Sequence, residues 1–283
     1  MSKTGLILEG GGMRGLYTAG VLDRLMEASI PVDGMVTVSA GALFGINFAS
    51  AQHGRALRYN KTYIKDKRYM SLRSLLTTGN LINKNFAYYT IPYKLDAFDE
   101  KAFKASSIDF YAAVTNMHNG QAEYRRITDP FDQMEILRAS GSLPIVSRPV
   151  ELEGKLYLDG GVADSIPYRK AKALGYAKRI VILTRPLTFK KTPSPSFLID
   201  RWYKDYPQFR RTLKNRYRNY NQTVEHITED EAEGEAFVFR PSQALAIKRL
   251  ERDKTKLQSM YDLGVEDADH RLDQLRMYLQ KTN

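Results

Sequence analysis

The 283-residue sequence contains no cysteine. This absence excludes disulfide bridges, thiolate zinc sites and a cysteine nucleophile. Long apolar segments are also missing. The apolar stretch at residues 5–8 stops at Glu9 and is too short for a secretory signal. The longest apolar run, residues 40–48, is far shorter than the about 20 residues of a membrane-spanning helix. We therefore expect a soluble, cytoplasmic protein in which residues 40–48 form a buried helix.

The chain has fewer acidic than basic residues. The chain has 43 Lys and Arg against 32 Asp and Glu, which gives a net charge of +11. Such an excess favours an anionic partner, namely nucleic acid, anionic lipid headgroups or an acidic substrate. No nucleic-acid-binding motif accompanies the charge, so nucleic acid is not expected. Two basic stretches, residues 55–73 and 201–218, are expected to be solvated helix faces, with peripheral contact to an anionic membrane as the alternative for the second.

Strands and helices alternate in the N-terminal part. Residues 5–8 and 33–38 are typical of short buried strands, and residues 14–28 and 40–51 are typical of helices. This order predicts an α/β protein with a parallel sheet and helices on both faces. Further strands are expected at residues 111–115, 122–127, 156–158, 180–183 and 236–239, the first two joined by a hairpin at Asn119-Gly120, and a helix at residues 265–279. We expect one domain, 1–283, in which residues from about 190 to 283 form a helical extension packed on the rest.

A glycine-rich loop separates the first predicted strand from the first helix. It consists of Gly10, Gly11, Gly12, Met13, Arg14 and Gly15. Glycine lets the backbone turn its N–H groups toward an anion, and the following helix N-terminus adds a favourable dipole. The loop therefore suits a phosphate or the oxyanion of an acyl-transfer intermediate. No lysine follows the glycines as in a nucleotide-binding phosphate loop, and tight packing would explain them equally well.

A serine, Ser39, falls where the second predicted strand meets its helix. Its neighbours are Thr37, Val38, Ala40 and Gly41. A serine on a sharp strand-to-helix turn presents its hydroxyl to a site, and small neighbours relieve crowding. The usual pattern has glycine where this chain has Thr37, whose side chain would crowd the turn. Alone, Ser39 would be interpreted as a helix N-cap.

A third feature, Asp159-Gly160-Gly161, ends another predicted strand. Asp-Gly pairs are common in surface turns, so this feature alone indicates only a turn.

Taken in this order, the glycine loop, the serine turn and the Asp-Gly-Gly segment resemble the patatin-like phospholipase family. Residues 8–22 are similar to the opening of bacterial members, and residues 139–144 are similar to the segment before the family's catalytic aspartate. The resemblance covers about residues 5–185. It implies a three-layer α/β/α sandwich with a mostly parallel central sheet and a Ser–Asp dyad.

Carried onto this sequence, the resemblance makes Ser39 the nucleophile and Asp159 its base. The glycine loop becomes the oxyanion hole, with the N–H groups of Gly11, Gly12 and Met13 as donors. The implied activity is hydrolysis of lipid carboxylic esters through an acyl-enzyme on Ser39. No metal and no organic cofactor are implied.

The sequence leaves two other functions open. The same dyad could transfer the acyl group to an acceptor other than water, or the protein could be a catalytically silent binder of anionic lipids. A triad would require a placed histidine. None of the four histidines, at positions 53, 118, 226 and 270, has a local setting that suggests catalysis. Asp159 is therefore predicted to act directly as the base.

Overall fold

Eight short strands form the centre of the computed structural model, which describes residues 2–281. They are β1 (Thr4–Leu8), β2 (Gly34–Val38), β3 (Asp109–Asn116), β4 (Ala122–Ile127), β5 (Val150–Leu152), β6 (Lys155–Asp159), β7 (Lys178–Ile182) and β8 (Ala236–Phe239). The order across the sheet is β5-β6-β3-β2-β1-β7-β8, and β4 pairs with β3. The run from β3 to β8 is parallel, whereas β4, β5 and β6 pair antiparallel.

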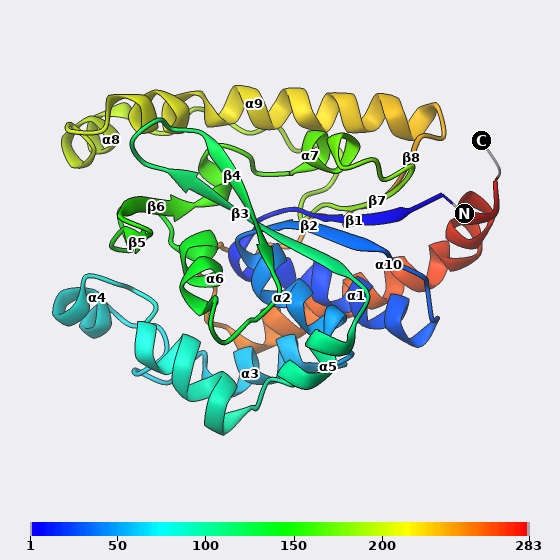
Figure 1. Ribbon diagram of the computed structural model, residues 1–283, viewed down its shortest axis with the longest axis horizontal. Helices are drawn as coiled ribbons and strands as arrows, with labels where there is room; N and C mark the ends of the chain where they lie inside the picture. The colour runs from blue at the N-terminus through cyan, green and yellow to red at the C-terminus, as the bar shows by residue number, and fades with distance from the viewer. Residues whose placement is uncertain (1, 282–283) are drawn as a thin grey trace.

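Helices cover both faces of this sheet (Figure 1). The α-helices are α1 (Leu16–Glu27), α2 (Ala40–Ala49), α3 (Arg55–Tyr63), α4 (Leu72–Thr78), α5 (Glu100–Ala105), α6 (Met134–Gly141), α7 (Tyr168–Ala173), α8 (Ser196–Trp202), α9 (Pro207–Ala232) and α10 (Lys254–Gln280). Two 3₁₀ turns, η1 (Gly12–Gly15) and η3 (Gly160–Val162), and a π-helix, η2 (Asn85–Leu95), complete the described elements. One layer contains α7 and α9, and the other contains α1, α2, α6 and α10. The fold is thus the expected three-layer α/β/α sandwich.

The strand β1 shows how the apolar pattern divides the core. Leu6 and Leu8 are fully buried in the cluster that includes α1, α2 and α10. Ile7, between them, is fully buried in the cluster that includes α7 and α9. Successive side chains of a strand point to opposite faces, so this short apolar strand is buried on both sides.

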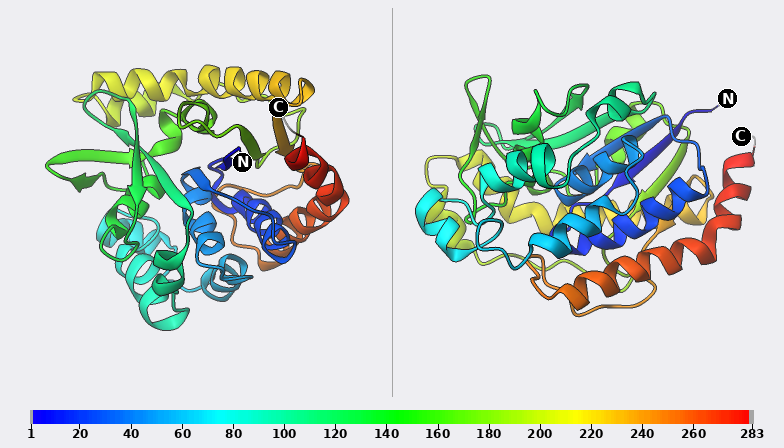
Figure 2. Two further views of the ribbon diagram at one scale, coloured as in Figure 1. Left: turned by 45° about the vertical axis from the view of Figure 1, so that its right-hand side comes forward. Right: turned by 90° about the horizontal axis from the view of Figure 1, so that it is seen from below.

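The C-terminal segment takes part in all three layers. β8 pairs with β7, α9 lies along one face of the sheet, and α10 packs against α1 on the other (Figures 1 and 2). α1 and α10 cross at two glycines. A Cβ on Gly20 would lie 2.2 Å from the carbonyl oxygen of Tyr261, and one on Gly264 would lie 2.2 Å from that of Tyr17. Only glycine permits two backbones to approach this closely.

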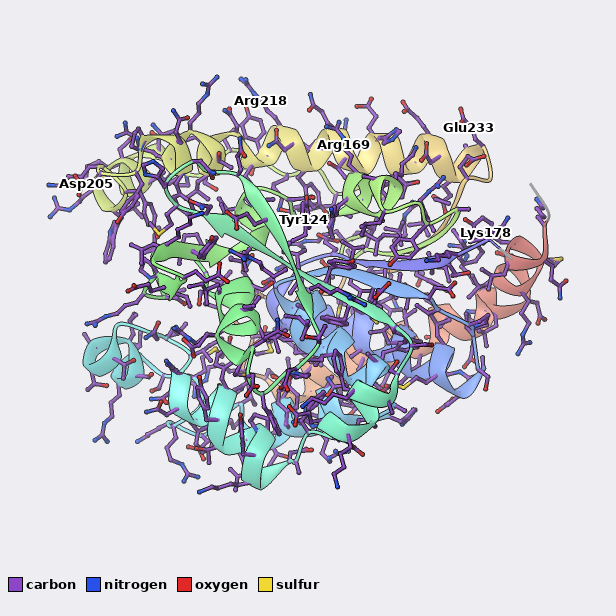
Figure 3. All side chains as sticks on the ribbon, viewed as in Figure 1. Tyr124, Arg169, Lys178, Asp205, Arg218 and Glu233 are labelled. Atoms are coloured by element: carbon purple, nitrogen blue, oxygen red, sulfur yellow. The ribbon has the colours of Figure 1, made fainter. Side chains whose placement is uncertain are left out.

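Most of the predicted strands and the alternation at the N-terminus are confirmed. The predicted hairpin around Asn119-Gly120 is the antiparallel pair β3–β4. The basic stretch 201–218 lies in α8 and the first half of α9, and Figure 3 places Arg218 midway along α9 and Glu233 at its far end. The expectation that the basic stretches are solvated faces is wrong at Arg55, which is 4% exposed and donates to Asn47 Oδ1 at 2.8 Å. Among the helices of residues 2–281, none is long and apolar enough to cross a bilayer.

Candidate active site

Ser39 occupies a strained turn between β2 and α2. Its backbone angles are φ 55° and ψ −126°, which non-glycine residues adopt rarely and at a cost of about 1–3 kcal/mol. The close packing of this turn explains the glycine at position 41. A Cβ on Gly41 would lie 2.8 Å from the carbonyl oxygen of Leu8 in β1. The N–H of Ser39 donates to the hydroxyl of Ser140 in α6 at 2.9 Å, which holds the turn from the other side.

The register of β3 brings Asp159 to this serine. β2 pairs with β3 up to Val38 and Ala113, and β6 takes the next position, where Asp159 pairs with Val114. Because β4 fills the other edge of β3, β2 and β6 share one edge and their carboxyl ends meet there. Ser39 Oγ donates to Asp159 Oδ2 at 2.7 Å, and both residues are buried.

The two glycines after Asp159 have separate structural roles. The N–H of Gly161 donates to Asp159 Oδ1 at 2.7 Å, which fixes the carboxylate so that Oδ2 faces the serine. A Cβ on Gly160 would lie 2.1 Å from the carbonyl oxygen of Ala113, so no other residue fits between η3 and β3. The Asp-Gly-Gly segment is therefore a buried carboxylate clamp, and its interpretation as a surface turn is wrong.

Thr37 is accommodated without displacing the turn. It is fully buried, and its hydroxyl donates to the carbonyl oxygen of Tyr111 in β3 at 2.7 Å. An added Cβ on Gly45 of α2 would lie 3.8 Å from Thr37 Cγ2, an ordinary van der Waals distance, so the threonine does not crowd α2 at this point.

The glycine loop runs beside Ser39. A Cβ on Gly10 would lie 3.0 Å from Ser39 Cβ, and Gly12 has a left-handed φ of +58°. The N–H of Gly10 donates to the carbonyl oxygen of Ser165, and that of Met13 donates to the carbonyl oxygen of Arg249 at 2.9 Å. Within residues 2–281, the N–H groups of Gly11 and Gly12 have no protein acceptor. Of the three expected oxyanion donors, Met13 is thus already engaged, while Gly11 and Gly12 are free.

Arg14, the charged residue of the loop, points into the protein. It is 7% exposed, and its Nε has no hydrogen-bond partner among the described residues. Burial, followed by the positive charges of Arg185 and Arg249, lowers its pKa to about 10. The next residue, Gly15, packs against Ala40, since an added Cβ would lie 2.9 Å from the Cβ of that residue.

The histidines lie in other surroundings. His53 is half exposed and lies 2.7 Å from Glu27, and His226 on α9 packs edge-to-face on Tyr168. His118 and His270 are exposed. Among the described residues, Asp159 is the hydrogen-bond partner of the Ser39 hydroxyl.

Sequence reasoning missed several residues of the site. Thr115 donates to the carbonyl oxygen of Asp159 at 2.9 Å and accepts from the N–H of Ala163, which links β3 to the turn after the aspartate. Arg216 on α9 belongs to the basic stretch expected to be solvated. Its Nε instead donates to Ser165 Oγ at 3.2 Å, and burial lowers the pKa of Arg216 to about 10. No local pattern signals either residue, because both contacts depend on packing between distant segments.

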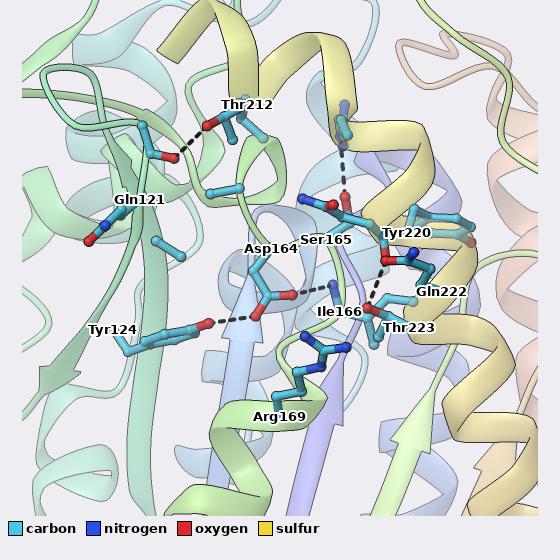
Figure 4. A pocket seen from close by; sticks show the side chains of 16 residues that line it. Gln121, Tyr124, Asp164, Ser165, Ile166, Arg169, Thr212, Tyr220, Gln222 and Thr223 are labelled. Atoms are coloured by element: carbon cyan, nitrogen blue, oxygen red, sulfur yellow. Dashed lines mark hydrogen bonds between the residues drawn. The ribbon is translucent and has the colours of Figure 1, made fainter. Parts of the chain in front are cut away.

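An apolar and a polar cavity lie near the site. A small apolar cavity of about 90 Å³ includes Leu43, Tyr88 and Leu137 in its lining. It begins one helical turn from Ser39, whose carbonyl oxygen accepts the N–H of Leu43. A polar cavity of about 370 Å³ lies between β4, α7 and α9 (Figure 4). There Tyr124 donates to Asp164 at 2.5 Å, and burial raises the pKa of this aspartate to about 6.

The fold and the site define an α/β sandwich protein with a buried serine–aspartate pair where the carboxyl end of β2 meets that of the antiparallel strand β6. The chain belongs to the patatin-like phospholipase family, whose model matches residues 6–172. A second model, described as a domain of unknown function (DUF6363), matches residues 206–280.

The curated relatives match this chain over only part of their own length. Uncharacterized protein YjjU of Escherichia coli K12 is 31% identical over 207 residues, which cover 72% of this chain and 58% of YjjU. Lysophospholipase nte1 of Emericella nidulans is 31% identical over 182 residues, which cover 60% of this chain and 11% of that protein. Among solved structures, VipD from Legionella pneumophila aligns over 96% of this chain and 67% of its own, with 12% identity and a TM-score of 0.46.

Proposed function

We propose that this protein is a lipid acyl hydrolase of the phospholipase A or esterase type, with Ser39 as nucleophile and Asp159 as base. The observation that carries the proposal is the 2.7 Å hydrogen bond from Ser39 Oγ to Asp159 Oδ2 on a strained turn. A serine hydroxyl needs such a base within hydrogen-bond reach to become a nucleophile. Membership of the patatin-like phospholipase family and the likeness to nte1, named a lysophospholipase, support a lipid ester as substrate.

The proposed reaction has two steps. Ser39 Oγ attacks the ester carbonyl carbon while its proton moves to Asp159, and the N–H groups of Gly11 and Gly12 bind the oxyanion. Collapse of the tetrahedral intermediate expels the alcohol, which takes the proton from Asp159. Asp159 then deprotonates a water molecule that attacks the acyl-enzyme. When this second tetrahedral intermediate collapses, the bond to Ser39 Oγ breaks, Ser39 Oγ takes the proton back from Asp159, and the carboxylic acid is released.

The hydrogen bonds around Asp159 orient its carboxylate for this mechanism. Gly161 occupies Oδ1, so Oδ2 is the oxygen left to accept the serine proton. Ser140 holds the N–H of Ser39, which keeps the hydroxyl aimed at the carboxylate. Preorganisation of this kind avoids reorganisation at the moment of reaction. The apolar cavity beginning at Leu43 would take the first carbons of an acyl chain.

Peripheral contact with a lipid surface forms part of the proposal. α4 and α8 lie at the same end of the molecule in Figures 1 and 2. They expose large apolar side chains, namely Leu72 (72%), Leu76 (86%), Phe197 (71%) and Trp202 (58%). Exposed apolar groups beside cations such as Arg201 and Lys204 suit a membrane with anionic headgroups.

Labelling with a fluorophosphonate, followed by mapping of the modified peptide, tests the nucleophile. We expect the label on Ser39, its loss in Ser39→Ala, and turnover of a short-chain nitrophenyl ester by the unmodified protein. A label on another serine would contradict the proposal. Absence of both labelling and turnover in folded protein would favour a silent lipid binder. Product analysis with an added alcohol separates hydrolysis from acyl transfer, since transfer yields a new ester.

A further inference from the structure

Five basic side chains from four separate segments meet beside the glycine loop. They are Arg14 in the loop, Arg185 and Lys191 after β7, Arg216 on α9 and Arg249 before α10, here termed the cationic cluster. Burial first, and then other members of the cluster, lower the pKa of Arg14, Lys191 and Arg216. Within residues 2–281, no member forms an ion pair with a carboxylate, and Glu9 and Asp159 offset the repulsion among the charges only in part.

Packing holds Lys191 in this cluster. Asn221 on α9 accepts from the N–H of Lys191 at 2.9 Å and donates to its carbonyl oxygen at 3.0 Å. The ammonium group of Lys191 lies 4.1 Å from the ring centroid of Tyr220. These contacts fix the position of the charge before any ligand binds.

Phe189 holds Arg185 in the same way. The guanidinium of Arg185 lies 4.3 Å from the ring centroid of Phe189, which packs edge-to-face on Tyr220 at 6.1 Å. An aromatic face stabilises a cation but leaves its N–H donors free for another partner.

The available carboxylates do not balance the cluster. One of them is Glu9, which is 2% exposed and whose Oε2 accepts the N–H of Thr184 at 2.6 Å. Asp159, the proposed base, is the second carboxylate that acts on a member of the cluster. Burial and the neighbouring cations lower the pKa of Lys191 to about 7. A group of like charges, one buried and four partly buried, with so little compensation favours binding of an additional anion.

A cavity of about 300 Å³ gives that anion a place. Its lining includes Arg14, Thr184 and Arg185, and it opens at the carboxyl ends of β7 and β8. Arg14 Nε and Thr184 Oγ1 are buried polar atoms without a partner among the described residues. The cavity adjoins the proposed oxyanion hole, because a Cβ on Gly11 would lie 2.8 Å from Thr184 Oγ1.

We propose that this cavity is an anion subsite that binds a phosphate group through Arg14, Thr184 and Arg185, with Lys191, Arg216 and Arg249 supplying positive potential. The planar guanidinium groups and the hydroxyl match the tetrahedral oxygens of a phosphate. The phosphate comes from a phospholipid headgroup or is a free phosphate ion. Binding itself is independent of the proposed hydrolase activity, whereas assignment to a headgroup rests on that activity.

Binding is tested with inorganic phosphate in Ser39→Ala protein, by calorimetric titration at constant ionic strength set with chloride. We expect saturable binding that weakens about tenfold or more in Arg185→Met, which removes a contact. Lys191→Met removes a more distant charge and should weaken binding by a smaller factor. The matched controls are Arg211→Met and Lys204→Met, two exposed positions of the same C-terminal segment. No phosphate binding, or equal binding in Arg185→Met and Arg211→Met, would overturn the proposal.

The source of the phosphate is decided with active protein. Phosphate that raises KM for a lysophospholipid without changing kcat, and leaves turnover of a nitrophenyl ester unchanged, identifies a headgroup subsite. If phosphate changes KM or kcat equally for the lysophospholipid and for the nitrophenyl ester, the site binds free phosphate. If neither substrate is turned over, the hydrolase proposal fails, while the calorimetric result still decides whether the subsite exists.

Discussion

The two parts of the chain contribute different things to the same site. Residues before 173 supply Ser39, Asp159, the glycine loop and the contacts that orient them, all within a few residues of strand ends. Residues after 173 supply Arg185, Lys191, Arg216 and Arg249, which approach from the segment after β7, from α9 and from the segment before α10. The positions of Ser39 and Asp159 are thus set by turns at the ends of neighbouring strands, whereas the positive potential beside them depends on the packing of loops and α9.

Removing the C-terminal part should have the largest effect. A chain ending at residue 205 lacks β8, α9 and α10, and would expose the apolar faces of β7 and α1. We propose that the whole chain is one folding unit, and we expect no cooperative unfolding of the truncated chain in urea. A cooperative transition in that chain would show that the N-terminal part folds independently.

A point substitution tests the same interface in the full chain. Gly264→Leu should lower the free energy of unfolding by about 3 kcal/mol or more, because the side chain meets the backbone of Tyr17. Glu266→Leu, at an exposed position on the same helix, is the control and should change it by less than about 0.5 kcal/mol.

Substitution of the dyad should abolish activity without unfolding the protein. Ser39→Ala and Asp159→Asn should each lower kcat for a nitrophenyl ester by about 10³-fold or more, and the double variant should be little worse because the two groups act as a unit. Asp164→Asn, which alters a nearby buried carboxylate, and the alanine variants of the four histidines should stay within a few-fold. If any histidine variant loses activity as fully as Ser39→Ala, a triad operates in place of the dyad.

Lys191 gives a pH-dependent test of the C-terminal charges. Its pKa is about 7 in the folded protein against an ordinary value of 10.5, first because of burial and then because of Arg216. Between these values the unfolded chain binds more protons than the folded one, so the contribution of Lys191 to stability rises with pH. Below pH 7 this contribution is at its most unfavourable.

Lys191→Met should therefore raise the melting temperature at pH 6 in phosphate-free buffer, and the gain should disappear as the pH approaches 10. Lys204→Met, an exposed lysine, should show no such trend. A difference in melting temperature that is constant with pH would mean that the charge of Lys191 does not destabilise the folded protein. The C-terminal part would then not differ from the N-terminal part in its electrostatics.

The difference between the N-terminal and C-terminal parts also explains which features could be predicted from the sequence. The alternation of strands and helices and the order of the glycine loop, Ser39 and Asp159 indicated the fold and the pair that the structure brings together. These features can be recognised in the local sequence, because glycine is required where two backbones come into contact, as at Gly41 and Gly160. The contacts of Arg216 and Thr115 cannot be recognised in this way, since both residues contact segments that are distant in the sequence.

Thr37 should show the smallest effect, and it tests whether the N-terminal part depends on local geometry as closely as proposed. Thr37→Gly removes the hydrogen bond to Tyr111 and adds flexibility to β2, so the free energy of unfolding should fall by about 1–2 kcal/mol. Thr37→Val keeps the bulk and removes only the hydroxyl. Because even an added Cβ at Gly45 would lie an ordinary 3.8 Å from Thr37 Cγ2, the threonine does not crowd α2, and nitrophenyl ester turnover by both variants should stay within about threefold of the parent. A large gain in Thr37→Gly alone would mean that the threonine strains the serine turn, whereas a large loss in folded protein would mean that it positions Ser39 through β3.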